Sequence, residues 1–212
     1  CFVTGEPGIG KSTVVETFLG ELAERSDVTV ALGHCVEQHG SPEAYLAVIE
    51  LLAKLRRSSH GDRVLAALVR HAPTFLAQVP HLVPDDRFEE ITRLARGGTE
   101  AKLVRELMEA IEAVCLHTPL VLVLEDLQWS DVATIDLLSM MYQRQERVPL
   151  LVIATSRHSE IQAHHHPLNH VMRTLVARAG ATAIQLGRIE PVDVRRFIEL
   201  RFPAHGLPVG LI

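Results

Sequence analysis

The sequence has few cysteines, no long apolar run and no excess of positive charge. Its 3 cysteines, Cys1, Cys35 and Cys115, show no C-x-x-C spacing, so neither a disulfide framework nor a zinc site is expected. No apolar stretch approaches the ~20 residues that a membrane-spanning helix requires. The formal net charge of −5 argues against a nucleic-acid-binding surface, because phosphate backbones select basic patches. These absences favour a cytoplasmic globular protein.

The two ends of the chain also lack expected features. The first residues already resemble a strand, with neither an initiator methionine nor a signal peptide before them. Residues 208–212 do not complete a helix or a strand. We therefore expect the chain to be a fragment of a longer protein. Its 212 residues, 47% of them hydrophobic, suffice for one sizeable core or for one domain and part of another.

A complete phosphate-binding pattern, G-x-x-x-x-G-K-[ST], stands near the start of the chain. It comprises Gly5, Glu6, Pro7, Gly8, Ile9, Gly10, Lys11 and Ser12. The glycines allow backbone N–H groups to turn toward anionic oxygens. The pattern places Lys11 at the β- and γ-phosphates and the hydroxyl of Ser12 at a Mg²⁺ ion. Thr13 follows in the first turn of a predicted helix, whose amino end also attracts phosphate. The sequence therefore predicts a nucleoside triphosphate site.

Strand-like and helix-like segments alternate along the chain. Apolar and β-branched runs predict strands at residues 2–4, 28–35, 119–124, 149–155 and 181–186. Periodic apolar positions predict helices from residue 13 and at residues 43–57, 62–71, 85–95, 99–116, 131–145 and 168–179. Strands separated by helices indicate an α/β fold with a parallel sheet and helices on both faces. The segment 40–118 is longer than one crossover helix requires, so we expect a helical elaboration there.

Two adjacent carboxylates, Glu125 and Asp126, follow the most apolar of the predicted strands. In enzymes with a phosphate-binding loop, such a strand brings one acid to the Mg²⁺ ion and another to the attacking water. The register puts Glu125 on the metal side and Asp126 on the water side. Because glutamate replaces the commoner aspartate at the first position, the two roles could also be shared or exchanged.

Together, these motifs resemble a known family. The segments 3–12, 122–131 and 151–157 are similar to AAA-type P-loop ATPases of the STAND class, and the segment 33–46 resembles the stretch that follows their second strand. STAND proteins are signal-transduction ATPases with numerous domains. The nearest resemblance is to the ATPase modules of large bacterial transcriptional regulators and of adenylate-cyclase-type signalling proteins. It extends from residue 2 to about residue 203.

The resemblance implies a five-stranded parallel sheet in the order 5-1-4-3-2. It implies that Arg157, just after the fourth strand, points at the γ-phosphate as a sensor residue and serves in catalysis beside the two acids. It divides the chain into a P-loop NTPase domain at residues 1–187 and the truncated start of a helical lid domain at residues 188–212.

The sequence also bears on the nucleotide and on the function. Its single asparagine, Asn169, excludes an N-K-x-D guanine-reading motif and so favours ATP or ADP, with Mg²⁺, over GTP. The favoured function is a regulatory switch that hydrolyses ATP slowly and gates the output of a larger bacterial protein. A loader ATPase acting with nucleic acid and a small-molecule kinase are the alternatives. The expected partners are ATP, other domains of the parent chain and an ATP-dependent homo-oligomer, without membrane or direct nucleic-acid contact from this segment.

Overall fold

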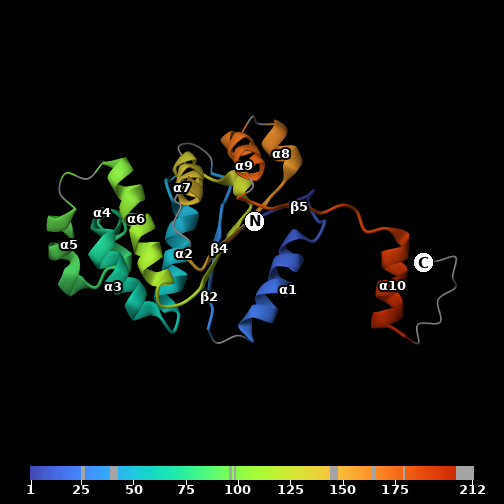
Figure 1. Ribbon diagram of the computed structural model, residues 1–212, viewed down its shortest axis with the longest axis horizontal. Helices are drawn as coiled ribbons and strands as arrows, with labels where there is room; N and C mark the ends of the chain where they lie inside the picture. Colours follow the sequence, from blue (N-terminus) through green and yellow to red (C-terminus); the bar gives the residue numbers. More distant parts are fainter. Residues whose placement is uncertain are drawn as a thin grey trace.

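Five parallel strands form a single sheet at the centre of the molecule (Figure 1). The structure, a computed structural model, describes residues 1–24, 27–38, 43–95, 97, 99–143, 148–163, 166–178 and 180–203. The strands are β1 (Phe2–Thr4), β2 (Thr29–His34), β3 (Leu120–Glu125), β4 (Leu150–Ser156) and β5 (Ala183–Gln185). Their spatial order is β2-β3-β4-β1-β5, which read from the other edge is 5-1-4-3-2. The predicted P-loop NTPase fold and its strand order are therefore confirmed.

Alternate residues of β3 face two separate cores. Val121 and Val123 pack with Val15 of helix α1 (Lys11–Ala23) in the smaller core. Leu120, Leu122 and Leu124 belong to the larger core on the other face. A central parallel strand must be apolar on both sides, which explains why its sequence reads as one continuous hydrophobic run.

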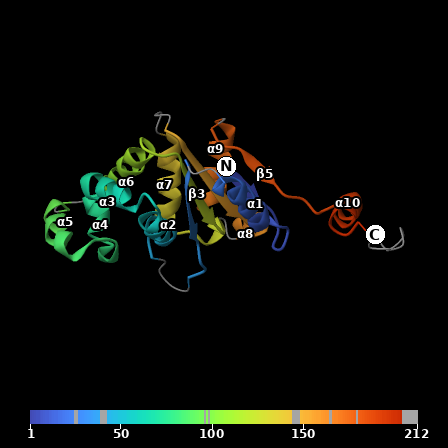
Figure 2. The ribbon, with the colours of Figure 1, turned by 90° about the horizontal axis from the view of Figure 1, so that it is seen from below.

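The chain between β2 and β3 is a helical region. It contains α2 (Leu46–Arg57), α3 (Gly61–His71), α4 (Pro73–Leu76), α5 (Phe88–Leu94) and α6 (Glu100–Cys115), with short 3₁₀ turns η1 (Pro80–Leu82) and η2 (Asp85–Arg87). Figures 1 and 2 show α3 to α6 gathered at one end of the molecule. Helix α2 starts three residues later than predicted because Tyr45 has a left-handed backbone, with φ of 62°, which a helix cannot continue. Residues 40–42 lie outside the described part.

The acidic strand is followed by η3 (Leu127–Trp129) and α7 (Val132–Gln143). Helices α8 (His158–Ala163) and α9 (Pro167–Ala177) come after β4. Asp131 starts α7 as a capping residue, because its Oδ1 accepts a 2.8 Å hydrogen bond from the backbone N–H of Thr134. Sequence periodicity missed α8, which is too short to show one. The predicted ends of α7 and α9 fall partly on residues 144–147 and 179, outside the described part.

Helix α10 (Pro191–Arg201) stands apart from the rest of the molecule (Figures 1 and 2). None of its residues is buried, and several of its apolar side chains are exposed, among them Val192, Phe197 and Leu200. The predicted lid segment continues over residues 204–212, which are outside the described part. Among the helices that the structure describes, none is long and apolar enough to cross a membrane.

Candidate functional site

The phosphate-binding loop joins the carboxyl end of β1 to α1. Gly8 and Gly10 have φ values of 76° and 100°, in the left-handed region that favours glycine. Gly5 is confined instead by its neighbours, because an added Cβ would lie 2.8 Å from Ile9 Cγ2. Three of the loop's glycines are therefore required by backbone geometry or by packing. Glu6, Pro7, Gly8, Ser12 and Thr13 are exposed, and Ile9 and Gly10 are half-buried.

Lys11 is folded back over its own loop. It is 8% exposed, and its Nζ donates to the carbonyl oxygens of Gly5 at 2.9 Å and of Glu6 at 3.1 Å. Burial lowers the pKa of the Lys11 ammonium group, and the negative charge of Asp126 opposes that shift. The side chain thus carries a partly desolvated positive charge at the place where the motif predicts phosphates.

Asp126 turns sharply at the end of β3. Its φ is 55°, a left-handed conformation that aspartate tolerates better than most residues. Its backbone N–H donates to Thr155 Oγ1 on neighbouring β4 at 3.0 Å. Its Oδ1 accepts a 2.8 Å hydrogen bond from Gln128 Nε2. The backbone of Asp126 is therefore held by β4, and its carboxylate is held by Gln128.

Arg157, which follows β4, meets the same carboxylate. Its Nε lies 3.6 Å from Asp126 Oδ1, and its Nη1 donates to Glu160 Oε1 at 2.8 Å. The hydrogen bond to Glu160 raises the pKa of the guanidinium. The backbone N–H of Arg157 donates to Gln128 Oε1 at 3.0 Å. Because β4 lies between β1 and β3, this arginine contacts Asp126 after β3, and its charge also acts on Lys11 of the phosphate-binding loop.

Glu125 has different surroundings from Asp126. Its Oε2 lies 3.5 Å from Nε2 of His34, its partner in the β2–β3 register. Asp126, and not Glu125, is among the charges that act on Lys11. The assignment of Glu125 to the metal side remains a prediction. Asp126 thus contacts Arg157 and acts electrostatically on Lys11, whereas Glu125 contacts β2.

Two residues that sequence reasoning did not assign contact the candidate site residues. Gln128 is 5% exposed and bridges the Asp126 side chain and the Arg157 backbone. Ser159 Oγ donates to Glu6 Oε2 at 2.9 Å and so joins α8 to the phosphate-binding loop. A glutamine or serine beside a motif carries no signal of its own. These contacts become visible only in the structure, which brings η3 and α8 to the ends of the strands.

The donors at this edge of the sheet suit a magnesium ion. Ser12 offers an exposed hydroxyl in the first turn of α1, and Glu125 and Asp126 offer carboxylate oxygens. Hydroxyl and carboxylate oxygens are ligands that Mg²⁺ accepts, and the ion usually completes its shell with phosphate oxygens and water. Within the described residues, no group of three or more His, Cys, Asp or Glu side chains could hold a metal ion by itself. A bound Mg²⁺ would supply positive charge next to the phosphates.

Most of this chain matches a known domain family. The model of the AAA ATPase domain matches residues 1–153, which include the phosphate-binding loop and both acids. The chain belongs to the AAA ATPase domain family. This AAA ATPase domain is also 31% identical, over 106 residues, to an uncharacterized protein of Rhizobium meliloti (strain 1021). That match covers 50% of this chain and 9% of the relative, so the chain spans a small part of that protein's length.

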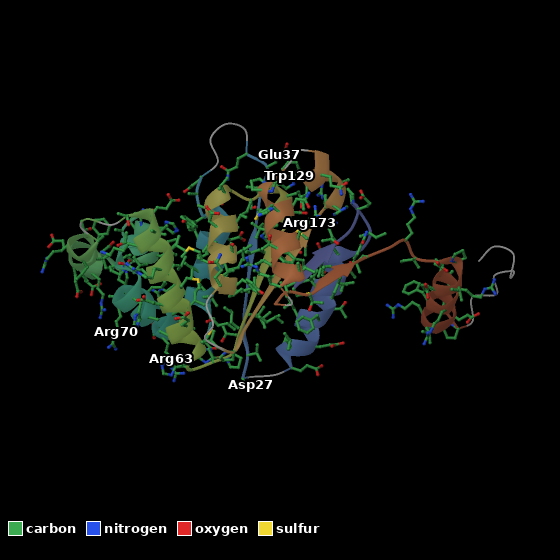
Figure 3. The ribbon with its side chains drawn as sticks, turned by 45° about the horizontal axis from the view of Figure 1, so that its top comes forward. Asp27, Glu37, Arg63, Arg70, Trp129 and Arg173 are labelled. Carbon is green, nitrogen blue, oxygen red and sulfur yellow. The ribbon has the colours of Figure 1, made fainter. Side chains whose placement is uncertain are left out.

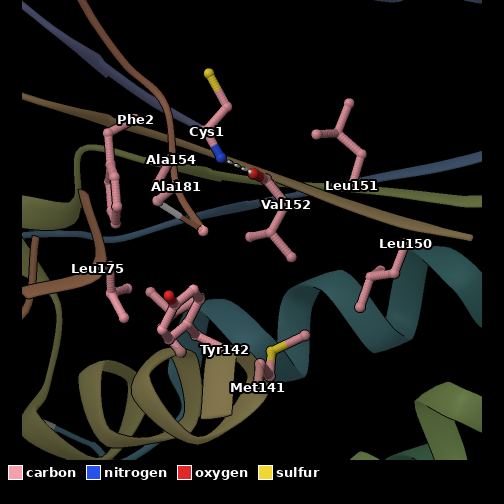
Figure 4. A pocket seen from close by; sticks show the side chains of 12 residues that line it. Cys1, Phe2, Met141, Tyr142, Leu150, Leu151, Val152, Ala154, Leu175 and Ala181 are labelled. Atoms are coloured by element: carbon pink, nitrogen blue, oxygen red, sulfur yellow. Dashed lines mark hydrogen bonds between the residues drawn. The ribbon is translucent and has the colours of Figure 1, made fainter. Parts of the chain in front are cut away.

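A cavity elsewhere in this AAA ATPase domain is distinct from the nucleotide site. It has a volume of about 240 Å³ and is lined mainly by apolar residues, including Tyr142 of α7 and Leu175 of α9 (Figure 4). Cys1 and Leu150 also line it, and they lie at the amino ends of β1 and β4. The phosphate-binding loop is at the carboxyl edge of the same sheet. The cavity therefore lies at the opposite edge of the sheet from the candidate nucleotide site.

Proposed function

We propose that this AAA ATPase domain is a nucleotide-dependent regulatory switch. It binds ATP with Mg²⁺, hydrolyses it slowly, and uses the difference between ATP and ADP to gate the output of a larger bacterial signalling or transcription-regulating protein. The family supports nucleotide binding and ATPase activity in general. The regulatory role is supported by the arrangement of one arginine.

The observation that carries the proposal is the position of Arg157. Its guanidinium lies 3.6 Å from Asp126 Oδ1, and both charges act on the pKa of Lys11. A γ-phosphate bound at Lys11 would offer the guanidinium a third anionic partner besides Asp126 and Glu160, and ADP would not. Charge-assisted contacts of this kind are strong and geometrically specific. The nucleotide state would therefore decide how Arg157 divides its contacts between Asp126, Glu160 and the ligand.

We further propose that residues 1–187 form the nucleotide-binding domain and that residues 188–212 begin a lid domain. Helix α10 supports this division, because none of its residues is buried and its apolar side chains are exposed. Such a helix is expected to pack against further protein. The other domains of the parent chain, or an ATP-dependent homo-oligomer, would then receive the signal.

The test compares the affinities for ATP and ADP in Arg157→Ala and in the parent. Losing a charge-assisted contact costs about 1.5–3 kcal/mol, which is about ten- to a hundredfold in affinity. We expect this loss for ATP only. Arg70→Ala is the matched control, because Arg70 is exposed on α3, well separated from Trp129 at the nucleotide edge (Figure 3). An unchanged ratio of ATP to ADP affinity in Arg157→Ala would contradict the switch.

A further inference from the structure

His34, the last residue of β2, lies between two carboxylates. Its Nδ1 is 3.0 Å from Glu50 Oε1, and its Nε2 is 3.5 Å from Glu125 Oε2. Glu50 belongs to α2, whereas Glu125 ends β3 and is one of the two candidate catalytic acids. The imidazole ring therefore connects the helical region with the nucleotide edge of the sheet.

Glu50 fixes the ring on the α2 side. Its Oε2 accepts a 2.7 Å hydrogen bond from the backbone N–H of His34, and its Oε1 lies 2.8 Å from Nζ of Lys54. Partial burial raises the pKa of Glu50, but hydrogen bonds from Lys54 and His34 outweigh that effect and lower it to about 2. Glu50 is thus a charged acceptor that holds both the backbone and the ring of His34.

The backbone next to His34 is pressed against α2. A Cβ on Gly33 would lie 2.1 Å from the carbonyl oxygen of Ala47, so only glycine permits this approach of strand and helix. On the other side, the backbone N–H of Cys35 donates to the carbonyl oxygen of Glu125 at 2.9 Å. The main chain around His34 is therefore fixed to α2 and to β3 at the same time.

We propose that His34 is a positioning residue for Glu125, held in place by Glu50 of α2. The ring orients the Glu125 carboxylate for the reaction, and α2 can change that orientation through Glu50. This proposal rests on the proposed ATPase function. Residues that orient a metal ligand or a catalytic acid from outside typically contribute ten- to a hundredfold to affinity or activity.

The experiment measures the Mg²⁺ concentration at which ATP turnover is half-maximal, and kcat at saturating Mg²⁺, in His34→Ala, His34→Gln and Glu50→Gln. We expect His34→Ala to raise that Mg²⁺ concentration about tenfold while kcat at saturating Mg²⁺ changes less than about twofold, because the register puts Glu125 on the metal side and Asp126 on the water side. His34→Gln keeps an N–H donor near the same position and should recover most of the Mg²⁺ affinity. Glu50→Gln should raise the Mg²⁺ concentration by less than His34→Ala, and the double variant should need no more Mg²⁺ than His34→Ala.

His60→Ala is the matched control. Nδ1 of His60 lies 3.0 Å from Thr29 Oγ1 at the other end of β2, so this variant also removes a histidine that contacts the strand. It should leave the Mg²⁺ dependence of turnover unchanged. A His34→Ala variant with the parent Mg²⁺ dependence, or equal changes in His34→Ala and His34→Gln, would overturn the positioning role.

A second measurement tests the role of His34 even if the protein shows no ATP turnover. A parent rate no higher than that of Lys11→Ala would overturn the proposed ATPase function. The link to Glu125 is then judged by the heat denaturation of His34→Ala, Glu125→Gln and the double variant. Interacting residues give a double variant that loses less than the sum of the single losses, whereas additive losses would overturn the proposal.

Discussion

The side-chain amide of Gln128 donates from Nε2 to Oδ1 of Asp126 at 2.8 Å. The same amide accepts a 3.0 Å hydrogen bond at Oε1 from the backbone N–H of Arg157. With 5% exposure, it has little water to replace either partner. Gln128 thus orients the candidate acid and the candidate sensor with one side chain, and a change at this residue should affect both.

Gln128→Glu should slow ATP turnover at least about tenfold and destabilise the fold. The new carboxylate still accepts from Arg157 but cannot donate to Asp126, and it sets a negative charge next to that carboxylate. A buried polar group that is left unsatisfied or is repelled by its neighbour lowers the free energy of unfolding by about 1–3 kcal/mol. Steady-state kinetics and urea unfolding measure the two effects. Gln143→Glu, an exposed change on α7, should alter neither. Parent-like turnover in Gln128→Glu would show that the bridge does not matter.

Lys11→Ala should abolish ATP binding without unfolding the domain. Lys11 is the only side chain of the loop that brings positive charge to the phosphates. Its charge is partly desolvated, since burial lowers its pKa, so its removal should cost little stability. Calorimetric titration with Mg²⁺ present measures the affinity, and circular dichroism reports the fold. Lys102→Ala on α6 is the control. The same affinity in Lys11→Ala and in the parent would refute the site.

Conservative variants of the two adjacent acids should differ in their effects on turnover and on the Mg²⁺ dependence of binding. Asp126→Asn should preserve ATP binding and stop turnover, and Glu125→Gln should mainly change the Mg²⁺ dependence of binding. These expectations follow from the strand register. Asp126 lies 3.6 Å from Nε of Arg157, and its charge acts on the pKa of Lys11, whereas Glu125 has neither relationship. If Glu125→Gln stops hydrolysis with its metal dependence intact, the roles are exchanged.

The three cysteines should differ in their reaction with iodoacetamide at pH 8. Burial raises the pKa of Cys35 to about 12 and that of Cys115 to about 11, whereas Cys1 is only half-buried. A thiol of pKa about 12 is ionised in about one molecule in 10,000 at pH 8, and the thiolate is the reactive form. Mass spectrometry should therefore find Cys1 modified first, and the other two only after denaturation. Rapid labelling of Cys35 in the folded protein would show that the end of β2 is not packed as described.

The sequence alone determined the fold class, the strand order expected from the resemblance, and the phosphate-binding loop. Each depends on local signals. The loop needs glycine at positions of left-handed backbone, such as Gly8 and Gly10, and a strand buried on both faces needs a continuous apolar run, as in β3. Because these requirements act on neighbouring residues, they can be recognised in the order of the letters.

Only the tertiary structure decided how the polar side chains meet. His34 and Glu125 are 91 residues apart in the chain, yet they form a contact, because β2 and β3 are neighbours in register. Likewise, the left-handed turn at Asp126 and the neighbouring end of β4 bring its carboxylate to Arg157. Such contacts depend on strand register, on backbone angles and on side-chain direction. These are settled by packing of the whole domain, and no local pattern encodes them.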